Sequence, residues 1–201
     1  DIASVTNDAP DTFPLGETVV TWTATDSSGN FATATQTVSV VDTTAPSIIA
    51  PDGVELEATS SGSTVDIGNP IYDDLVDIAS VTNDAPDTFP LGETVVTWTA
   101  TDSSGNFATA TQTVSVVDTT APSISSPNNI TIEATGAEDN LADMGIYTAN
   151  DAVEIISIVN DAPDTFPLGE TVVTWTATDS SGNFATATQT VSVVDTTAPS
   201  I

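Results

Sequence analysis

Hydrophobic and polar residues alternate with a period of two along most of this chain. In the segment 17–25, Val20, Trp22 and Ala24 fall on one face, and threonines occupy the other face. The segment 31–41 repeats the pattern, with alanines and valines on one face and threonine and serine on the other. Such alternation is typical of a half-buried β-strand, and Thr is favoured on an exposed strand face. Both segments are therefore predicted to be strands, with the tryptophan in the core rather than on a sugar-binding surface.

Turn residues separate these strands. The loop 26–30, Asp-Ser-Ser-Gly-Asn, predicts a hairpin in which Gly29 and Asn30 adopt positive φ. Further strands are expected over 47–59 and 78–81, with 65–68 running back between them. No helical periodicity exceeds one turn. Short strands between loops rich in Pro, Gly and Asp predict an all-β fold of tandem immunoglobulin-like β-sandwich domains in a linear array.

The chain is built from a repeated unit. Residues 1–48 recur without change as 77–124, and again as 154–201 with differences only in the first six positions. A fixed period of this kind indicates an array of domains. We expect the chain to be an excerpt of a longer polypeptide that begins and ends within a repeat. The predicted boundaries are a truncated repeat at 1–42, complete repeats at 43–118 and 119–195, and the start of another at 196–201.

The charge of the chain is entirely acidic. Its 29 Asp and Glu residues face no Lys, Arg or His, and the formal net charge is −29. Nucleic acid and anionic lipid are bound through cationic side chains, so neither is an expected partner. The carboxylates need cations from solution, and Ca²⁺, which prefers oxygen ligands, is the first candidate. The alternative is that the acidity only maintains solubility in a saline medium.

Other chemistry is excluded by residues that the chain lacks. Without Cys it forms neither disulfides nor zinc–thiolate sites. Without His, Cys, Lys or Arg only carboxylate catalysis remains, so we expect no enzyme and assign no catalytic or cofactor-binding residue. No apolar run approaches the roughly 20 residues of a membrane span.

Several motifs recur in order within each unit: Asp-Thr-Thr-Ala-Pro at 42–46, Phe-Pro-Leu-Gly at 89–92, Val-Thr-Trp-Thr-Ala-Thr-Asp at 96–102 and Gly-Asn at 105–106. In this order they resemble the hyalin repeat (HYR) domain, an immunoglobulin-like module of extracellular and adhesion proteins. The resemblance implies a secreted or cell-surface protein. Animal members often carry a cysteine pair, whose positions here are taken by Ala50 with Ala110 and by Ser126 with Ala187. That loss, with the linker sequence, resembles bacterial and archaeal surface proteins.

Acidic residues should gather where consecutive repeats join. Up-and-down strands would place the loops 71–75 and 102–106 at the end of the domain that faces the linker 42–46. Several oxygen ligands from three segments would suit Ca²⁺, although each acid alone could merely stabilise a turn or begin a linker. The predicted ligands are Asp42, Asp73, Asp74, Asp102 and Asn106 at one junction, Asp118, Asn150, Asp151, Asp179 and Asn183 at the next, and Asp8, Asp11, Asp84 and Asp87 from the opposite loops.

The predicted function is structural. Serial copies suit a segment of an extracellular filament or surface stalk, with neighbouring repeats or further copies of the chain as partners. The alternative is an adhesin module that binds glycans or another cell surface. The Asn-Ile-Thr sequon at Asn129 is a candidate for glycosylation.

Overall fold

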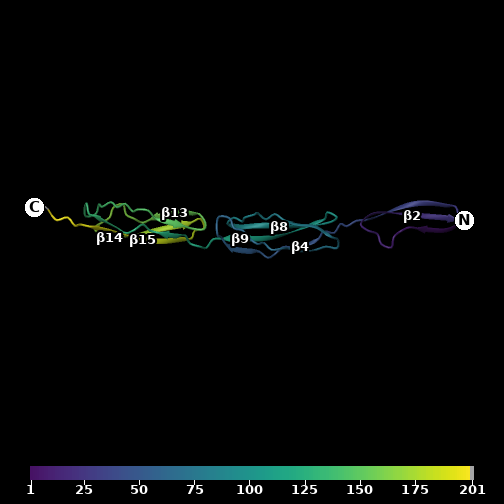
Figure 1. Ribbon diagram of the computed structural model, residues 1–201, viewed down its shortest axis with the longest axis horizontal. Coiled ribbons are helices and arrows are strands. Elements are labelled where there is room, and N and C mark those ends of the chain that lie inside the picture. Colours follow the sequence, from purple (N-terminus) through teal and green to yellow (C-terminus); the bar gives the residue numbers. More distant parts are fainter. Residues whose placement is uncertain (200–201) are drawn as a thin grey trace. The chain divides into compact units, whose positions relative to one another are not determined.

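The computed structural model describes residues 1–199, and its regular elements are β-strands (Figure 1). Residues 200–201, the end of the predicted last segment 196–201, lie outside the described residues. The described part contains no helix long and apolar enough to cross a membrane. The strands are β1 Ile2–Asn7, β2 Gly16–Asp26, β3 Phe31–Val40, β4 Ser47–Ile49, β5 Val54–Glu57, β6 Ile71–Asp73, β7 Ile78–Asn83, β8 Gly92–Asp102, β9 Phe107–Val117, β10 Ser123–Ser125, β11 Ile130–Glu133, β12 Thr148–Asn150, β13 Ile155–Asn160, β14 Gly169–Asp179 and β15 Phe184–Val194.

Contacts between residues divide the chain into two compact units. The first comprises residues 1–51, 68–84 and 96–112, and the second comprises residues 52–67, 85–95 and 113–201. The first unit contains the antiparallel sheet β1-β2-β3 and the antiparallel pair β4–β6. It also contains β7, which pairs with the part of β8 from Trp98 to Asp102.

The second unit contains a sheet of order β11-β15-β14-β13 and the pair β10–β12. In this sheet β11 runs parallel to β15, and β14 runs antiparallel to both of its neighbours, β15 and β13. The sheet that contains β8 has the same plan, in the order β5-β9-β8-β7. The chain is therefore all-β, with tandem β-sandwich repeats, as the alternation predicted.

The core lies on the apolar face of the long hairpin. In the second unit Phe166, Val173, Trp175, Val191 and Val193 form a buried cluster. Partly buried residues of the small strands, among them isoleucines of β10 and β11, pack against it. The period-two pattern produces this core, because every second residue of β14 and β15 faces inward.

The core tryptophans have polar partners. Trp98 donates from Nε1 to Oε1 of Gln112 at 3.1 Å, and Trp175 makes the same bond to Gln189 at 3.2 Å. Gln189 in turn donates to two backbone carbonyls. The buried amide is thus satisfied, as burial of a polar group requires. The prediction that these tryptophans belong to the core is confirmed for Trp98 and Trp175, each 5% exposed, and is wrong for Trp22, which is 40% exposed.

The structure corrects three local predictions. The expected single strand over 47–59 is two strands, β4 and β5, which pair with different partners. The returning strand is β6 at 71–73, a segment expected to be a loop, rather than 65–68. Among the described residues only glycines have positive φ, so Asn30 does not adopt the left-handed conformation predicted for it. Its side chain instead donates from Nδ2 to Oδ2 of Asp26 at 2.9 Å.

Candidate metal centres

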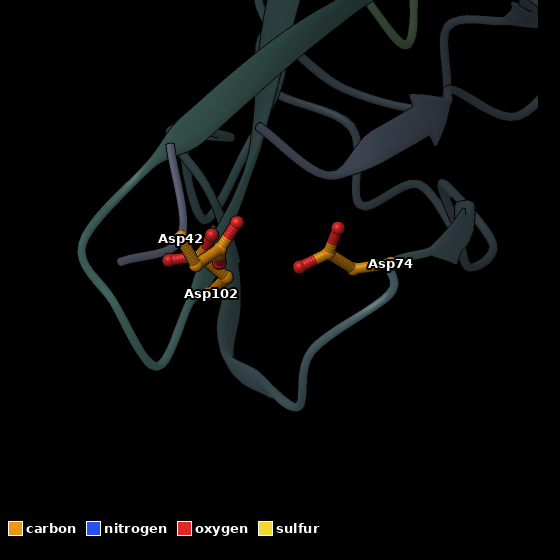
Figure 2. A group of neighbouring side chains, drawn as sticks. All are labelled: Asp42, Asp74 and Asp102. Carbon is orange, nitrogen blue, oxygen red and sulfur yellow. The ribbon is translucent and has the colours of Figure 1, made fainter. Parts of the chain in front are cut away.

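Two groups of three aspartates gather at equivalent places in consecutive repeats. In each group one carboxylate oxygen from each aspartate lies within 4.8 Å of the other two. One aspartate comes from the Asp-Thr-Thr-Ala-Pro linker, one from the segment after a short strand, and one from the end of a long strand. Figure 2 shows Asp42 and Asp102 next to each other and the carboxylate of Asp74 turned toward them. The groups are Asp42, Asp74 and Asp102, and Asp118, Asp151 and Asp179.

The hairpin turn fixes the third aspartate of each group. Asp102 accepts hydrogen bonds at Oδ1 from the backbone N–H groups of Ser104 (2.9 Å) and Asn106 (2.8 Å), and at Oδ2 from Nδ2 of Asn106 (2.8 Å). Gly105 closes the turn with φ of 92°, a conformation that costs other residues strain. Burial opposes ionisation of Asp102, but the bonds from Asn106 and the turn amides outweigh it and hold its pKa below the ordinary value.

Asp179 is held in the same way. Ser181 and Asn183 donate backbone N–H groups to its Oδ1, and Nδ2 of Asn183 donates to its Oδ2 at 3.0 Å. Burial again opposes ionisation, and the bonds from Asn183 and the turn again lower the pKa. Asp102 is 2% exposed and Asp179 is fully buried, so each triad holds a carboxylate kept ionised inside the protein.

The asparagine of the turn also contacts the linker. Asn106 donates from Nδ2 to the backbone oxygen of Asp42 at 3.2 Å and to its Oδ2 at 3.5 Å. In the other group Asn183 donates to the backbone oxygen of Asp118 at 3.1 Å. Asn106 and Asn183, both predicted as ligands, therefore serve in this structure as donors that bring the linker aspartate to the turn aspartate.

Each triad holds a buried carboxylate oxygen that lacks a hydrogen-bond partner among the described residues. These atoms are Oδ2 of Asp74 and Oδ2 of Asp118, and Asp118 as a whole is 9% exposed. Leaving a buried charged oxygen unpaired is costly, and clustering three carboxylates adds mutual repulsion. The chain has no Lys, Arg or His to offset that charge, and a cation from solution could do so.

The donor set suits a hard divalent cation. Ca²⁺ binds oxygen at roughly 2.3–2.6 Å, so two ligands on one ion lie at most about 5 Å apart. The 4.8 Å limit within each triad agrees with that geometry. Ca²⁺ takes six to eight oxygens, so backbone carbonyls and water would complete the shell. The triads can thus hold Ca²⁺ through carboxylates from three separate segments.

Other predicted ligands lie outside both triads. Asp73 and Asn150 are exposed ends of β6 and β12, and their backbone carbonyls accept hydrogen bonds from Oγ of Ser47 and of Ser123. Asp8 and Asp84 accept the backbone N–H groups of Thr21 and Thr97, each at 2.6 Å, and so stabilise the adjoining strand. Asp11 and Asp87 are exposed loop residues.

Asn129, the predicted glycosylation site, is exposed immediately before β11. Its Oδ1 accepts the backbone N–H of Thr190 at 2.9 Å. Glycosylation at Asn129 stays a prediction.

Sequence reasoning missed one pair of polar residues beside the linkers. Glu57, the last residue of β5, accepts hydrogen bonds from Thr119 and Thr120, and Glu133 at the end of β11 does the same for Thr196 and Thr197. Backbone and hydroxyl donors lower the pKa of both glutamates. The only signal in the sequence was the shared Glu-Ala-Thr at 57–59 and 133–135.

Comparison with known proteins places the repeats in a family. The model of the HYR domain family matches residues 1–40, 41–116 and 117–193. Hyalin of Lytechinus variegatus is 42% identical in a match that covers 95% of this chain and 39% of hyalin. Hyalin of Strongylocentrotus purpuratus is 39% identical in a match that covers 100% of this chain and 18% of that hyalin. The sushi, von Willebrand factor type A, EGF and pentraxin domain-containing protein 1 of Rattus norvegicus is 31% identical over 78% and 5%.

The chain thus spans less than two fifths of these relatives. All three come from animals, so the expected prokaryotic origin has no support among them. Among solved structures, protocadherin PcdhgB3 EC1-4 is 16% identical, with a TM-score of 0.38, and the match covers 90% of this chain and 57% of that chain. Human desmocollin-1 is 15% identical, with a TM-score of 0.33, and the match covers 90% of this chain and 47% of that chain. On the match of the family model to all three repeats, the chain belongs to the HYR domain family.

Proposed function

We propose that this chain is a segment of an extracellular filament or surface stalk in which Ca²⁺ binds at the start of each repeat. The observation that carries the proposal is Oδ2 of Asp118, a buried oxygen without a partner among the described residues, placed within a triad of carboxylates. No donor among the described residues bonds to that atom, and the chain has no cationic side chain to neutralise its charge. A cation bound there would supply the missing contact.

The calcium would act on the linker. Asp118 follows β9 directly, whereas Asp151 and Asp179 belong to the repeat that comes after it. An ion bound by all three carboxylates would tie the linker to that repeat and limit the freedom of the chain between them. The role is therefore mechanical, and neighbouring repeats are the first partners. A non-catalytic role agrees with the residues present, since near-identical repeats carry no distinct pair of catalytic carboxylates.

Calcium titration tests the metal centres. We expect isothermal titration calorimetry of the whole chain to show two saturable Ca²⁺ sites. Asp74→Asn and Asp151→Asn should each abolish one site, because each removes a charge from one triad. Asp73→Asn is the matched control, since it removes an exposed charge beside Asp74 but outside the triad. The proposal is wrong if all variants bind alike or if no saturable binding occurs.

Solution scattering tests the mechanical role. In Ca²⁺ the distribution of interatomic distances should be narrower than in EDTA, and the largest distance should be better defined, because bound ions limit linker motion. The Asp74→Asn, Asp151→Asn double variant should give the EDTA profile in both conditions. If calcium binds but the profiles of the parent chain coincide, the ions stabilise the repeats without stiffening the array.

A further inference from the structure

We infer that Glu57 is a positioning residue for the Asp118 metal centre: its carboxylate holds the linker so that Asp118 presents Oδ2 to Asp151 and Asp179. The inference rests on the proposed function and adds to it a residue from the preceding repeat, Glu57, whose hydrogen bonds go to Thr119 and Thr120 rather than to a carboxylate of the triad. The family match assigns Glu57 to 41–116 and Asp118 to 117–193.

The Glu57 carboxylate accepts hydrogen bonds from the linker. Its Oε1 accepts the backbone N–H of Thr119 at 2.7 Å and Oγ1 of Thr120 at 2.8 Å, and its Oε2 accepts Oγ1 of Thr119 at 3.0 Å. Hydrogen bonds to a charged acceptor are stronger than neutral ones, and three of them at two adjacent residues restrict both backbone and side chains. Glu57 thereby fixes the two residues that follow Asp118.

The residue before Asp118 is fixed as well. Val117 pairs with Glu57 at the end of the parallel ladder, and the carbonyl of Val117 accepts the N–H of Ala58 at 2.6 Å. Asp118 therefore stands between two residues that are both tied to the end of β5. Its own Oδ1 accepts the N–H of Thr120 at 3.2 Å, which leaves Oδ2 as the oxygen available to a cation.

The linker aspartates of the two triads differ in the surroundings of Oδ2. Oδ2 of Asp42 accepts a hydrogen bond from Asn106, whereas Oδ2 of Asp118 has no partner among the described residues.

The contact recurs at the next linker. Glu133 accepts the N–H and Oγ1 of Thr196, each at 2.8 Å, and Oγ1 of Thr197 at 3.0 Å. This second copy follows Asp195, and neither triad includes Asp195. Removal of Glu133 therefore breaks equivalent hydrogen bonds to those of Glu57 without touching the linker that carries Asp118, which makes it a matched control.

The test measures Ca²⁺ affinity by calorimetry in the whole chain carrying Asp74→Asn, so that only the Asp118 centre remains. Glu57→Ala should weaken this site about tenfold, and Glu57→Gln, which keeps one acceptor oxygen, should weaken it less. Glu133→Ala should leave the affinity unchanged. In the reciprocal background, Asp151→Asn, Glu57→Ala should leave the Asp42 centre unchanged, which a general loss of folding would not do.

Each outcome decides between the two claims. Equal affinities for Glu57→Ala and Glu133→Ala, with calcium still bound, would overturn the role of Glu57 and leave the metal centres standing. A loss of affinity at both centres would also overturn it, because the effect would then be a general one. Absence of calcium binding in the Asp74→Asn parent would remove the metal centre itself and the inference with it.

Discussion

Asp26, Asp102 and Asp179 occupy the same turn in three identical stretches of sequence, and they differ in how far they are buried. All three accept the same bonds from the turn and its asparagine. Asp102 and Asp179 are buried, and a linker aspartate and a loop aspartate lie beside each of them. The turn thus supplies a fixed, ionised carboxylate, and the neighbouring segments complete the proposed metal centre.

The lowered pKa of Asp26 predicts how stability depends on pH. Hydrogen bonds from Asn30 hold it below the ordinary 3.8, so its stabilising contribution is complete above that value and is lost as the pH falls through the folded pKa. In EDTA, the melting temperature of the parent should therefore fall below about pH 4. Asp26→Asn should melt at a lower temperature at neutral pH and lose less on acidification.

Differential scanning calorimetry from neutral to acidic pH would measure this effect. Protonation also relieves the self-repulsion of the acidic surface, which acts in the opposite direction in both proteins. The comparison between parent and variant removes that common contribution. Parallel curves for the two proteins would show that the bonds to Asp26 contribute nothing that depends on its charge.

The glycine of the turn gives a second prediction at this scale. Gly105→Ala should destabilise its repeat by roughly 1 kcal/mol or more, because an alanine is strained at a φ of 92° even though no atom lies within 4 Å of the added Cβ. Gly136→Ala is the control, since its Cβ would also meet open space and its φ is not positive. Urea unfolding of both variants would measure the difference, and equal losses would contradict the prediction.

At the scale of elements, the alternating pattern predicted the long strands well and the short ones poorly. The strands over 17–25 and 31–41 match β2 and β3 within one residue, because burial of every second residue dominates there. The segment 47–59 divides into β4 and β5, whose partners lie far away in the sequence. Strands of three or four residues carry too little pattern to show which sheet they join.

The candidate site could likewise be predicted in part from the sequence. Asp42, Asp74 and Asp102 were predicted to converge because their loops lie at one end of the strands, and they do so. Asp73, however, could not be told from Asp74 without the register of β6. The contribution of Glu57 depends on a parallel pairing of β5 with β9, which local sequence does not encode.

The hairpin of β14 and β15 also predicts unequal stabilities for its valines. Val193 of β15 is 2% exposed and belongs to the buried cluster, whereas Val172 of β14 is 61% exposed. Val193→Ala should therefore cost roughly 2 kcal/mol, and Val172→Ala less than about half of that, because less apolar surface is lost. Thermal unfolding followed by calorimetry would measure both, and equal losses would show that burial in the cluster does not decide the contribution of Val193.

At the scale of the whole molecule, a charge of −29 makes every salt stabilising to some degree, so calcium must be distinguished from screening. Sodium chloride should raise the melting temperature gradually, since the Debye length falls to about 10 Å only near 0.1 M. Calcium should act at far lower concentration, because a ligand at about a hundred times its Kd stabilises a one-site protein by about 2.7 kcal/mol.

MgCl₂ provides the matched control, since it has the same ionic strength and valence but Mg²⁺ dehydrates reluctantly and demands octahedral geometry. Melting curves at equal concentrations of the two salts should therefore separate, with calcium higher, in the parent chain and coincide in the Asp74→Asn, Asp151→Asn variant. Coincident curves in the parent would mean that the triads only collect counterions, as an acidic surface does without any built site.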